Sequence, residues 1–129
     1  MTLENQGRRE EKEIRRKLAA LFASDVAGYT RLMAEDEEGT IRRLVEHRAI
    51  MDSLIEHHGG RIANTAGDSV LAEFESSVDA VRCAIEVQEA IRTKNDGLPE
   101  SRWLQFRIGV NVGDVIRQGG DRVDPFVAS

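Results

Sequence analysis

The feature that most constrains the fold is a ten-residue segment, residues 103–112, in which apolar and more polar residues alternate. Its apolar positions are Leu104, Phe106, Ile108, Val110 and Val112. Because successive side chains of a β-strand point to opposite faces of the sheet, this pattern predicts a strand with one face on the core and one polar face. A sheet built around such a strand is expected to be covered on one side only.

Four further segments predict the elements around this strand. An apolar run that ends at Asp25 is expected to be a buried strand of about five or six residues. Residues 27–60 are expected to be helical, residues 61–74 to form a β-hairpin, and residues 76–95 to form a second amphipathic helix. This order predicts an α+β fold of the ferredoxin-like type, an antiparallel sheet with helices on one face.

Composition excludes several classes of protein. A length of 129 residues suits one domain, and a net charge of -5 with 5% aromatic residues argues against a nucleic-acid partner. A single cysteine, Cys83, permits no internal disulfide and no cysteine zinc cluster, and a reducing, cytoplasmic setting fits best. No run approaches 18 apolar residues, so we expect no direct membrane span.

Two carboxylates mark a candidate site. Asp25 ends the first predicted strand and Asp68 lies at the hairpin tip, so the two acids meet at one sheet edge if these strands are neighbours. Paired carboxylates repel each other unless a cation is close, and their hard oxygens suit Mg²⁺ or Mn²⁺. A helix that begins behind Asp25 offers free N–H groups to a phosphate. On spacing alone, the structural interpretation is favoured: Gly67-Asp68 is more often a turn and Asp25 more often a helix cap.

Three segments, in consistent order and spacing, resemble the catalytic domain of bacterial class III adenylate and guanylate cyclases. They are residues 21–40 (LFASDVAGYTRLMAEDEEGT), 58–88 (HGGRIANTAGDSVLAEFESSVDAVRCAIEVQ) and 105–116 (QFRIGVNVGDVI). The resemblance implies a ferredoxin-like domain that dimerises head to tail, with active sites at the dimer interface. It also implies conversion of ATP to cyclic AMP and pyrophosphate with two metal ions, Mg²⁺ or Mn²⁺.

The resemblance assigns roles to matched positions. Asp25 and Asp68 would be the metal ligands, and the carbonyl of Val26 would complete the second metal site. The backbone groups that would meet the β- and γ-phosphates belong to Gly28, Tyr29 and Thr30. No side chain is assigned a catalytic role of its own.

The purine-reading positions depart from the family pattern. Many members have a lysine where this chain has Asn64, and an amide does not fix adenine over guanine, so GTP stays possible beside ATP. Asp121 could match the acidic purine-recognition residue.

The chain then departs more strongly, reading RVDPFVAS where the family continues with a pattern like VNVAARLE. The resemblance therefore covers residues 18–121, between a charged helical lead-in (1–17) and a divergent tail (122–129). In the family, that segment supplies an asparagine that orients the ribose and an arginine that stabilises the transition state. Because neither has a match here, we expect a C-terminally truncated domain that is weak or inactive. The alternative is a non-catalytic cyclase-like module that dimerises or binds a nucleotide to regulate another protein.

The remaining polar residues are interpreted as structural. His47, His57 and His58 lack the spacing of a zinc site, and Cys83 is expected to pack among apolar neighbours. Arg107 lies on the polar face of its strand and is expected to be solvated, with a role at an interface or in lining a site as the alternative. We expect a homodimer or a swapped assembly, because missing elements leave faces uncovered.

Overall fold

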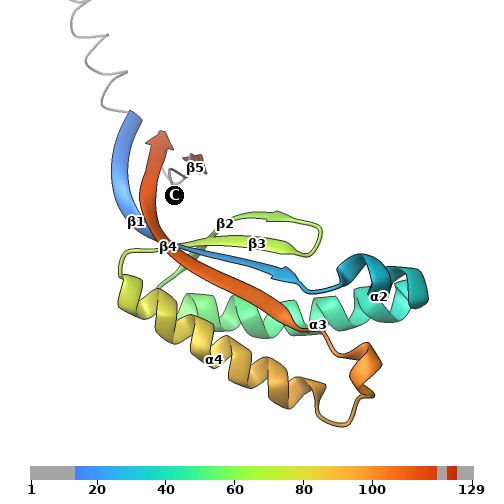
Figure 1. Ribbon diagram of the computed structural model, residues 1–129. Coiled ribbons are helices and arrows are strands. Elements are labelled where there is room, and N and C mark those ends of the chain that lie inside the picture. The colour runs from blue at the N-terminus through green and yellow to red at the C-terminus, as the bar shows by residue number, and fades with distance from the viewer. Residues whose placement is uncertain (1–13, 119–121, 125–129) are drawn as a thin grey trace, which may run out of the picture.

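The computed structural model of the protein describes residues 14–118 and 122–124. In chain order its elements are β1 (Ile14–Val26), α2 (Tyr29–Glu35), α3 (Glu37–His57), β2 (Arg61–Ala66), β3 (Ser69–Phe74), α4 (Ser77–Asn95), the 3₁₀ helix η1 (Glu100–Arg102), β4 (Phe106–Gln118) and β5 (Arg122–Asp124) (Figure 1). The predicted hairpin at residues 61–74 and the predicted helix at residues 76–95 are confirmed.

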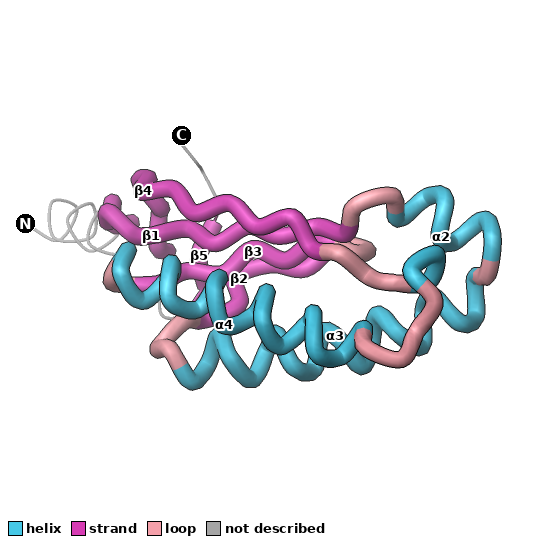
Figure 2. The backbone as a smooth tube through the Cα atoms, turned by 60° about the horizontal axis from the view of Figure 1, so that its bottom comes forward, coloured by secondary structure: helices cyan, strands magenta, loops and turns pink. Residues whose placement is uncertain are grey.

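The described strands form one antiparallel sheet in the order β2-β3-β1-β4-β5. Helices α3 and α4 cover one of its faces (Figure 2). The first and last strands of the β-α-β-β-α-β series are paired at the centre, so the ferredoxin-like α+β prediction is confirmed.

The first strand is much longer than expected. Residues 14–17, predicted to end a helical lead-in, belong to β1, which pairs with β4 from Ile14 opposite Gln118 to Val26 opposite Phe106. Charge pairs at i,i+4 stabilise a helix by only about 0.2–0.5 kcal/mol each, whereas a ladder satisfies the backbone groups along the whole strand. The rest of the expected lead-in, residues 1–13, lies outside the described residues, as do 119–121 and 125–129.

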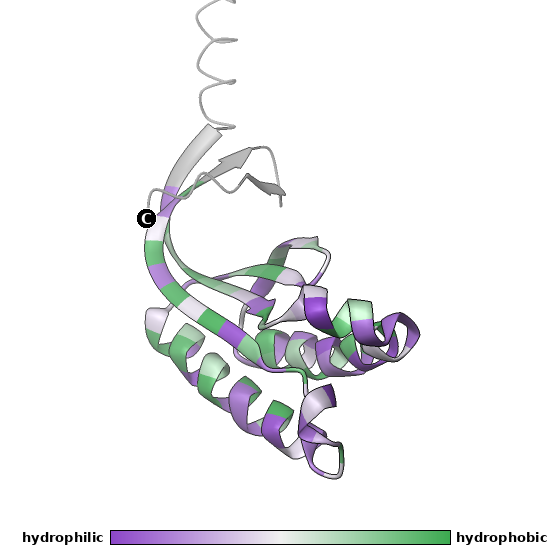
Figure 3. Ribbon diagram, turned by 45° about the vertical axis from the view of Figure 1, so that its right-hand side comes forward, coloured by the Kyte–Doolittle hydropathy of each residue, from purple (hydrophilic) through white to green (hydrophobic). Residues whose placement is uncertain are grey.

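The main core lies between the sheet and the two long helices. Its largest fully buried side chains include Phe22 of β1, Phe74 of β3 and Met51 of α3. The alternation in β4 is visible as bands of hydropathy (Figure 3), but Val112 is 57% exposed because β1 and β4 run on together past the helices (Figure 1). The prediction of one core-facing side therefore holds for the first half of β4 only.

Cys83 of α4 is fully buried in this core, as expected for a packing residue. Burial raises the pKa of its thiol to about 11, with a smaller contribution from the charge of Glu86. The thiol is therefore protonated at neutral pH and has no nucleophilic role.

The helix is interrupted between α2 and α3, where the sequence pattern predicted one continuous helix. Asp36 has an extended backbone, and its Oδ1 accepts a hydrogen bond from the backbone N–H of Gly39 at 3.1 Å. This is an N-cap, and an aspartate that caps a new helix ends the old one.

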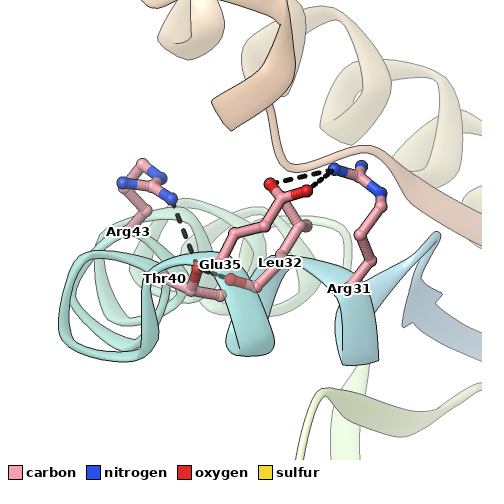
Figure 4. Close-up of polar contacts among 5 residues, drawn as sticks. All are labelled: Arg31, Leu32, Glu35, Thr40 and Arg43. Carbon is pink, nitrogen blue, oxygen red and sulfur yellow. Dashed lines mark hydrogen bonds and ion pairs between the residues drawn. The ribbon is translucent and has the colours of Figure 1, made fainter.

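Thr40 fastens α2 to α3. Its hydroxyl donates to the backbone carbonyl of Leu32 at 3.0 Å and accepts from Nη2 of Arg43 at 3.3 Å (Figure 4). Arg31 and Glu35 form an exposed ion pair along α2. The buried Thr40 contact holds the short helix α2 in place, and with it the turn that follows β1.

A buried polar link joins α3, α4 and the segment before β4. The ring of His47 lies 2.7 Å from the carbonyl oxygen of Arg43 and 3.0 Å from Oδ1 of Asn95. Asn95 also donates to the carbonyl of Leu104 at 2.9 Å and accepts from its N–H at 3.3 Å. His47 is thus a structural residue, as the sequence reading expected.

We expect Asn95→Ala to lower the free energy of unfolding by about 2–3 kcal/mol, because it strands buried polar groups of His47 and Leu104. Thr93→Ala, an exposed change on the same helix, is the matched control and should cost less than about 0.5 kcal/mol. Urea unfolding followed by circular dichroism measures both, and equal losses would contradict the assigned role of Asn95.

Candidate functional site

The two candidate carboxylates lie at one edge of the sheet. Asp25 is the last residue but one of β1, and Asp68 lies in the turn between β2 and β3. Because β3 runs antiparallel to β1, with Ser24 opposite Val70, the hairpin tip lies beside the end of β1. Oδ2 of Asp68 accepts a hydrogen bond from the backbone N–H of Val26 at 2.8 Å, which fixes this carboxylate against β1.

A hollow of about 340 Å³ opens at this edge. It is lined by Asp25, Val26, Gly28, Tyr29, Thr30, Asp68, Ser69 and Arg107. The structure thus brings together the six residues that the resemblance assigned to metal binding and phosphate binding. It adds Ser69 and Arg107, to which the resemblance assigned no role.

Two glycines shape the turns beside this hollow. Gly28 has φ +66° and caps α2, and Gly67 has φ +57° in the hairpin turn. Side chains other than glycine rarely adopt this left-handed region, so both turns depend on glycine. A Cβ on Gly67 would meet no protein atom, so the backbone conformation is its structural reason for being there.

Arg107 is the residue whose position the sequence reading missed. It stands directly opposite Asp25 in the β1–β4 ladder. Its Nε donates to Oδ1 of Asp25 at 2.7 Å and its Nη2 donates to Oδ2 at 2.9 Å. The side chain is 68% exposed, as expected on the polar face of its strand, but it also pairs with Asp25, because the strand pairing, which the sequence pattern does not give, places an acid beside this base.

The electrostatics of the hollow follow from the side chains of Asp25, Asp68 and Arg107. The hydrogen bond to Asp25 is the main cause of a raised pKa of Arg107, and the charges of Asp25 and Asp68 add to it. Two carboxylates against one guanidinium leave a formal excess of one negative charge.

These residues fit a divalent cation. The carboxylates and the backbone carbonyls are hard oxygen donors of the kind that Mg²⁺ and Mn²⁺ prefer, and Arg107 shows that Asp25 already holds a cation. Within residues 14–118 and 122–124, no group of three or more His, Cys, Asp or Glu side chains could hold a metal. A metal here would therefore rest on two side chains, with backbone, water or ligand oxygens completing its shell.

Asn64 reaches the same side of the sheet through a β-bulge. Ile62 pairs with Ala72 and Asn64 with Leu71, so Ala63 is the extra residue of the bulge. This extra residue changes the face of the sheet to which the following side chains point. Asn64 lines a second hollow of about 460 Å³, which shares Asp25, Ser69 and Arg107 with the first. Asp121, the other candidate for purine recognition, lies outside the described residues.

The histidines stay apart from this site. His47 is buried between the two long helices, and His58 pairs with Glu86 of α4. No helix of the described residues is long and apolar enough to cross a membrane.

The sheet order and the position of the helices define the class of the protein, a ferredoxin-like α+β domain with an acidic site at one sheet edge. Residues 11–121 match the family model described as the adenylate and guanylate cyclase catalytic domain, and the chain belongs to this family.

Two relatives carry cyclase names. The chain is 42% identical over 111 residues to a putative adenylate cyclase 3 of Rhizobium meliloti (strain 1021), which covers 85% of this chain and 19% of the relative. It is 32% identical over 113 residues to an adenylate cyclase of Streptomyces coelicolor, over 87% of this chain and 28% of that one. The chain therefore spans less than a third of the length of either relative.

Solved structures agree with this membership. An adenylate/guanylate cyclase/hydrolase from Silicibacter pomeroyi superimposes with a TM-score of 0.74 at 38% identity, over 86% of this chain and 64% of that chain. The guanylyl cyclase Cya2 does so with a TM-score of 0.72 at 27% identity, over 89% and 65%. The chain thus spans slightly under two thirds of each solved structure.

We expect Gly28→Ala to lower the free energy of unfolding by about 1–2 kcal/mol, because alanine resists the left-handed conformation. Gly109→Ala is the matched control, since Gly109 has an ordinary strand conformation and there is open space where the Cβ of alanine would lie. Thermal unfolding compares the two, and a Gly28 variant as stable as the Gly109 variant would contradict the strain assigned to this turn.

Proposed function

We propose that this chain is the metal- and phosphate-binding part of a nucleotidyl cyclase that converts ATP to cyclic AMP and pyrophosphate. The observation that carries the proposal is the hollow in which Asp25, Asp68, Val26 and residues 28–30 come together. Membership of the family, and relatives named adenylate cyclase, support this choice of reaction.

Asp25, Asp68 and the carbonyl of Val26 would hold two Mg²⁺ or Mn²⁺ ions. When bound, such ions polarise phosphate oxygens and lower the pKa of a coordinated hydroxyl, here the ribose 3′-hydroxyl. The protein's own part is to hold the carboxylates in place: the hydrogen bond from Val26 orients Asp68, and Arg107 pairs with Asp25 while no metal is bound.

The turn of residues 28–30 would receive the β- and γ-phosphates. The first N–H groups of a helix have no partner within it, and α2 begins at Tyr29, three residues after Val26. Gly28 presents backbone alone at this point, so a phosphate can approach closely. Together with Arg107, these groups offer positive potential to a triphosphate.

A second copy of the chain is the partner we propose, as a homodimer or a swapped assembly. The described residues would supply the groups that bind metal and phosphate at an open sheet edge, and a complete site needs further groups for ribose and purine, which a second copy would provide. Asn64 and Asp121 are proposed to read the purine, and GTP stays a possible substrate beside ATP. A substrate of this kind agrees with the cytoplasmic setting expected from the sequence.

A non-catalytic nucleotide-binding or dimerisation module is the second candidate. One observation favours it: residues 122–129 read RVDPFVAS at the place where the family has a segment with an asparagine for the ribose and an arginine for the transition state. Such a module would bind the metal–nucleotide complex without turning it over.

The first test is Mn²⁺-dependent ATP binding measured by calorimetry. Asp25→Asn and Asp68→Asn should each weaken binding by about tenfold to a hundredfold or more, because each removes a charged metal ligand while keeping its size. Asp52→Asn, which removes a carboxylate paired with Arg48 on α3, is the control and should bind normally. Binding that is indifferent to both site variants would refute the proposed metal site.

Turnover by the pure 129-residue chain should be very slow. A transition-state arginine contributes about 10³–10⁵ in rate to related phosphoryl transfers, and the chain lacks the matched one. Chromatographic detection of cyclic AMP and cyclic GMP with Mn²⁺ should show product near the background of Asp68→Asn. Robust formation of either product would overturn this expectation and the non-catalytic alternative together.

A further inference from the structure

Arg107 holds both carboxylate oxygens of Asp25 at once. Its Nε and Nη2 donate to Oδ1 and Oδ2 at 2.7 Å and 2.9 Å. This two-point geometry is the strongest arrangement open to an arginine and a carboxylate. Asp25 is also a proposed metal ligand, so a metal ion and Arg107 compete for the same two oxygens.

We propose that Arg107 is an exchangeable counter-ion of the metal site, which holds Asp25 in the metal-free protein and gives it up when a divalent cation binds. The inference rests on the proposed function, because it concerns the same aspartate. Arg107 acts through Asp25 and is therefore a positioning residue.

The surroundings of Arg107 allow this exchange. The side chain of Arg107 is 68% exposed and that of Asp25 is 40% exposed, so neighbouring atoms do not lock the pair. Exposed ion pairs are weak, with a contribution that corresponds to at most about a fivefold change in an equilibrium. A divalent cation, with twice the charge and a second carboxylate at Asp68, can displace such a pair.

The exchange also explains how the metal-free site tolerates two acids. Arg107 holds Asp25 at two points and lines the same hollow as Asp68, so one guanidinium stands beside both acids. It offsets their mutual repulsion until a metal does so. The released guanidinium stays in the same hollow, because its backbone is fixed in the β1–β4 ladder opposite Asp25.

The test measures Mn²⁺ affinity without nucleotide by calorimetry on the 129-residue chain, after circular dichroism shows that each variant is folded. Arg107→Gln should bind Mn²⁺ about twofold to fivefold more tightly than the native chain, because the competitor is gone. Arg107→Lys keeps the charge but cannot span both oxygens, so its affinity should lie between the two.

Lys17→Gln is the matched control. It removes one positive charge from an exposed ion pair with Glu75 on the same strand, eight residues and roughly 26 Å from Asp25. Its Mn²⁺ affinity should equal that of the native chain. A general effect of net charge would instead tighten binding in Lys17→Gln as much as in Arg107→Gln.

A spectroscopic readout separates exchange from simple support. In ¹⁵N-labelled protein, the Nε–H signal of Arg107 should shift toward the position of a free arginine on addition of Mg²⁺. In Asp25→Asn it should start nearer that position and respond little. A signal in the native chain that ignores saturating Mg²⁺ would overturn the proposal.

The remaining outcomes are distinct. Asp25-dependent Mn²⁺ binding that is unchanged or weaker in Arg107→Gln would overturn the exchange and leave the cyclase metal site standing. Native-like affinity in Arg107→Lys, with tighter binding in Arg107→Gln, would overturn it in favour of plain charge repulsion. Absence of Asp25-dependent binding in the native chain would overturn the proposed metal site and the exchange with it.

Discussion

The antiparallel pairing of β1 with β4 is the constraint on which the rest of the structure depends. The ladder runs along all 13 residues of each strand and lies at the centre of the sheet. It directs Phe22 and Phe106 to the helices and places Arg107 opposite Asp25 on the other face. A slip of one residue would turn Arg107 toward the helices, so packing and site geometry share one register.

Much of this arrangement could be predicted from local pattern. The alternation around Phe106 gave the orientation of β4, and the order of elements gave the fold. The resemblance picked out Asp25 and Asp68, which the structure places in one hollow. The orientation of the strand, the order of elements and the proximity of the two acids were predictable because each depends on residues close together in the sequence, or on motifs with constant spacing.

What the sequence could not supply depends on long-range pairing. Arg107 and Asp25 are 82 residues apart, and nothing in the pattern around either residue indicates the other. The bulge at Ala63 likewise has no local signal, yet it brings Asn64 to the face that bears the site. The N-terminal part of β1 was misread for the same reason, since its polar residues favour a strand only because β4 is there to pair with them.

The openness of the site carries a physical consequence for its chemistry. Two unit charges 4 Å apart interact by about 1 kcal/mol in bulk water and by about 4 kcal/mol where the effective dielectric constant is near 20. Because Asp25 and Arg107 are both in contact with solvent, the interaction energies between charges at this site lie near the weak end of this range.

Covering the site with a second surface would strengthen every interaction there without altering a residue of this chain. The same cover would also favour exchange of Arg107 for a metal, because excluding water raises the cost of a poorly neutralised pair of carboxylates. Assembly and metal binding are therefore expected to reinforce each other at this site.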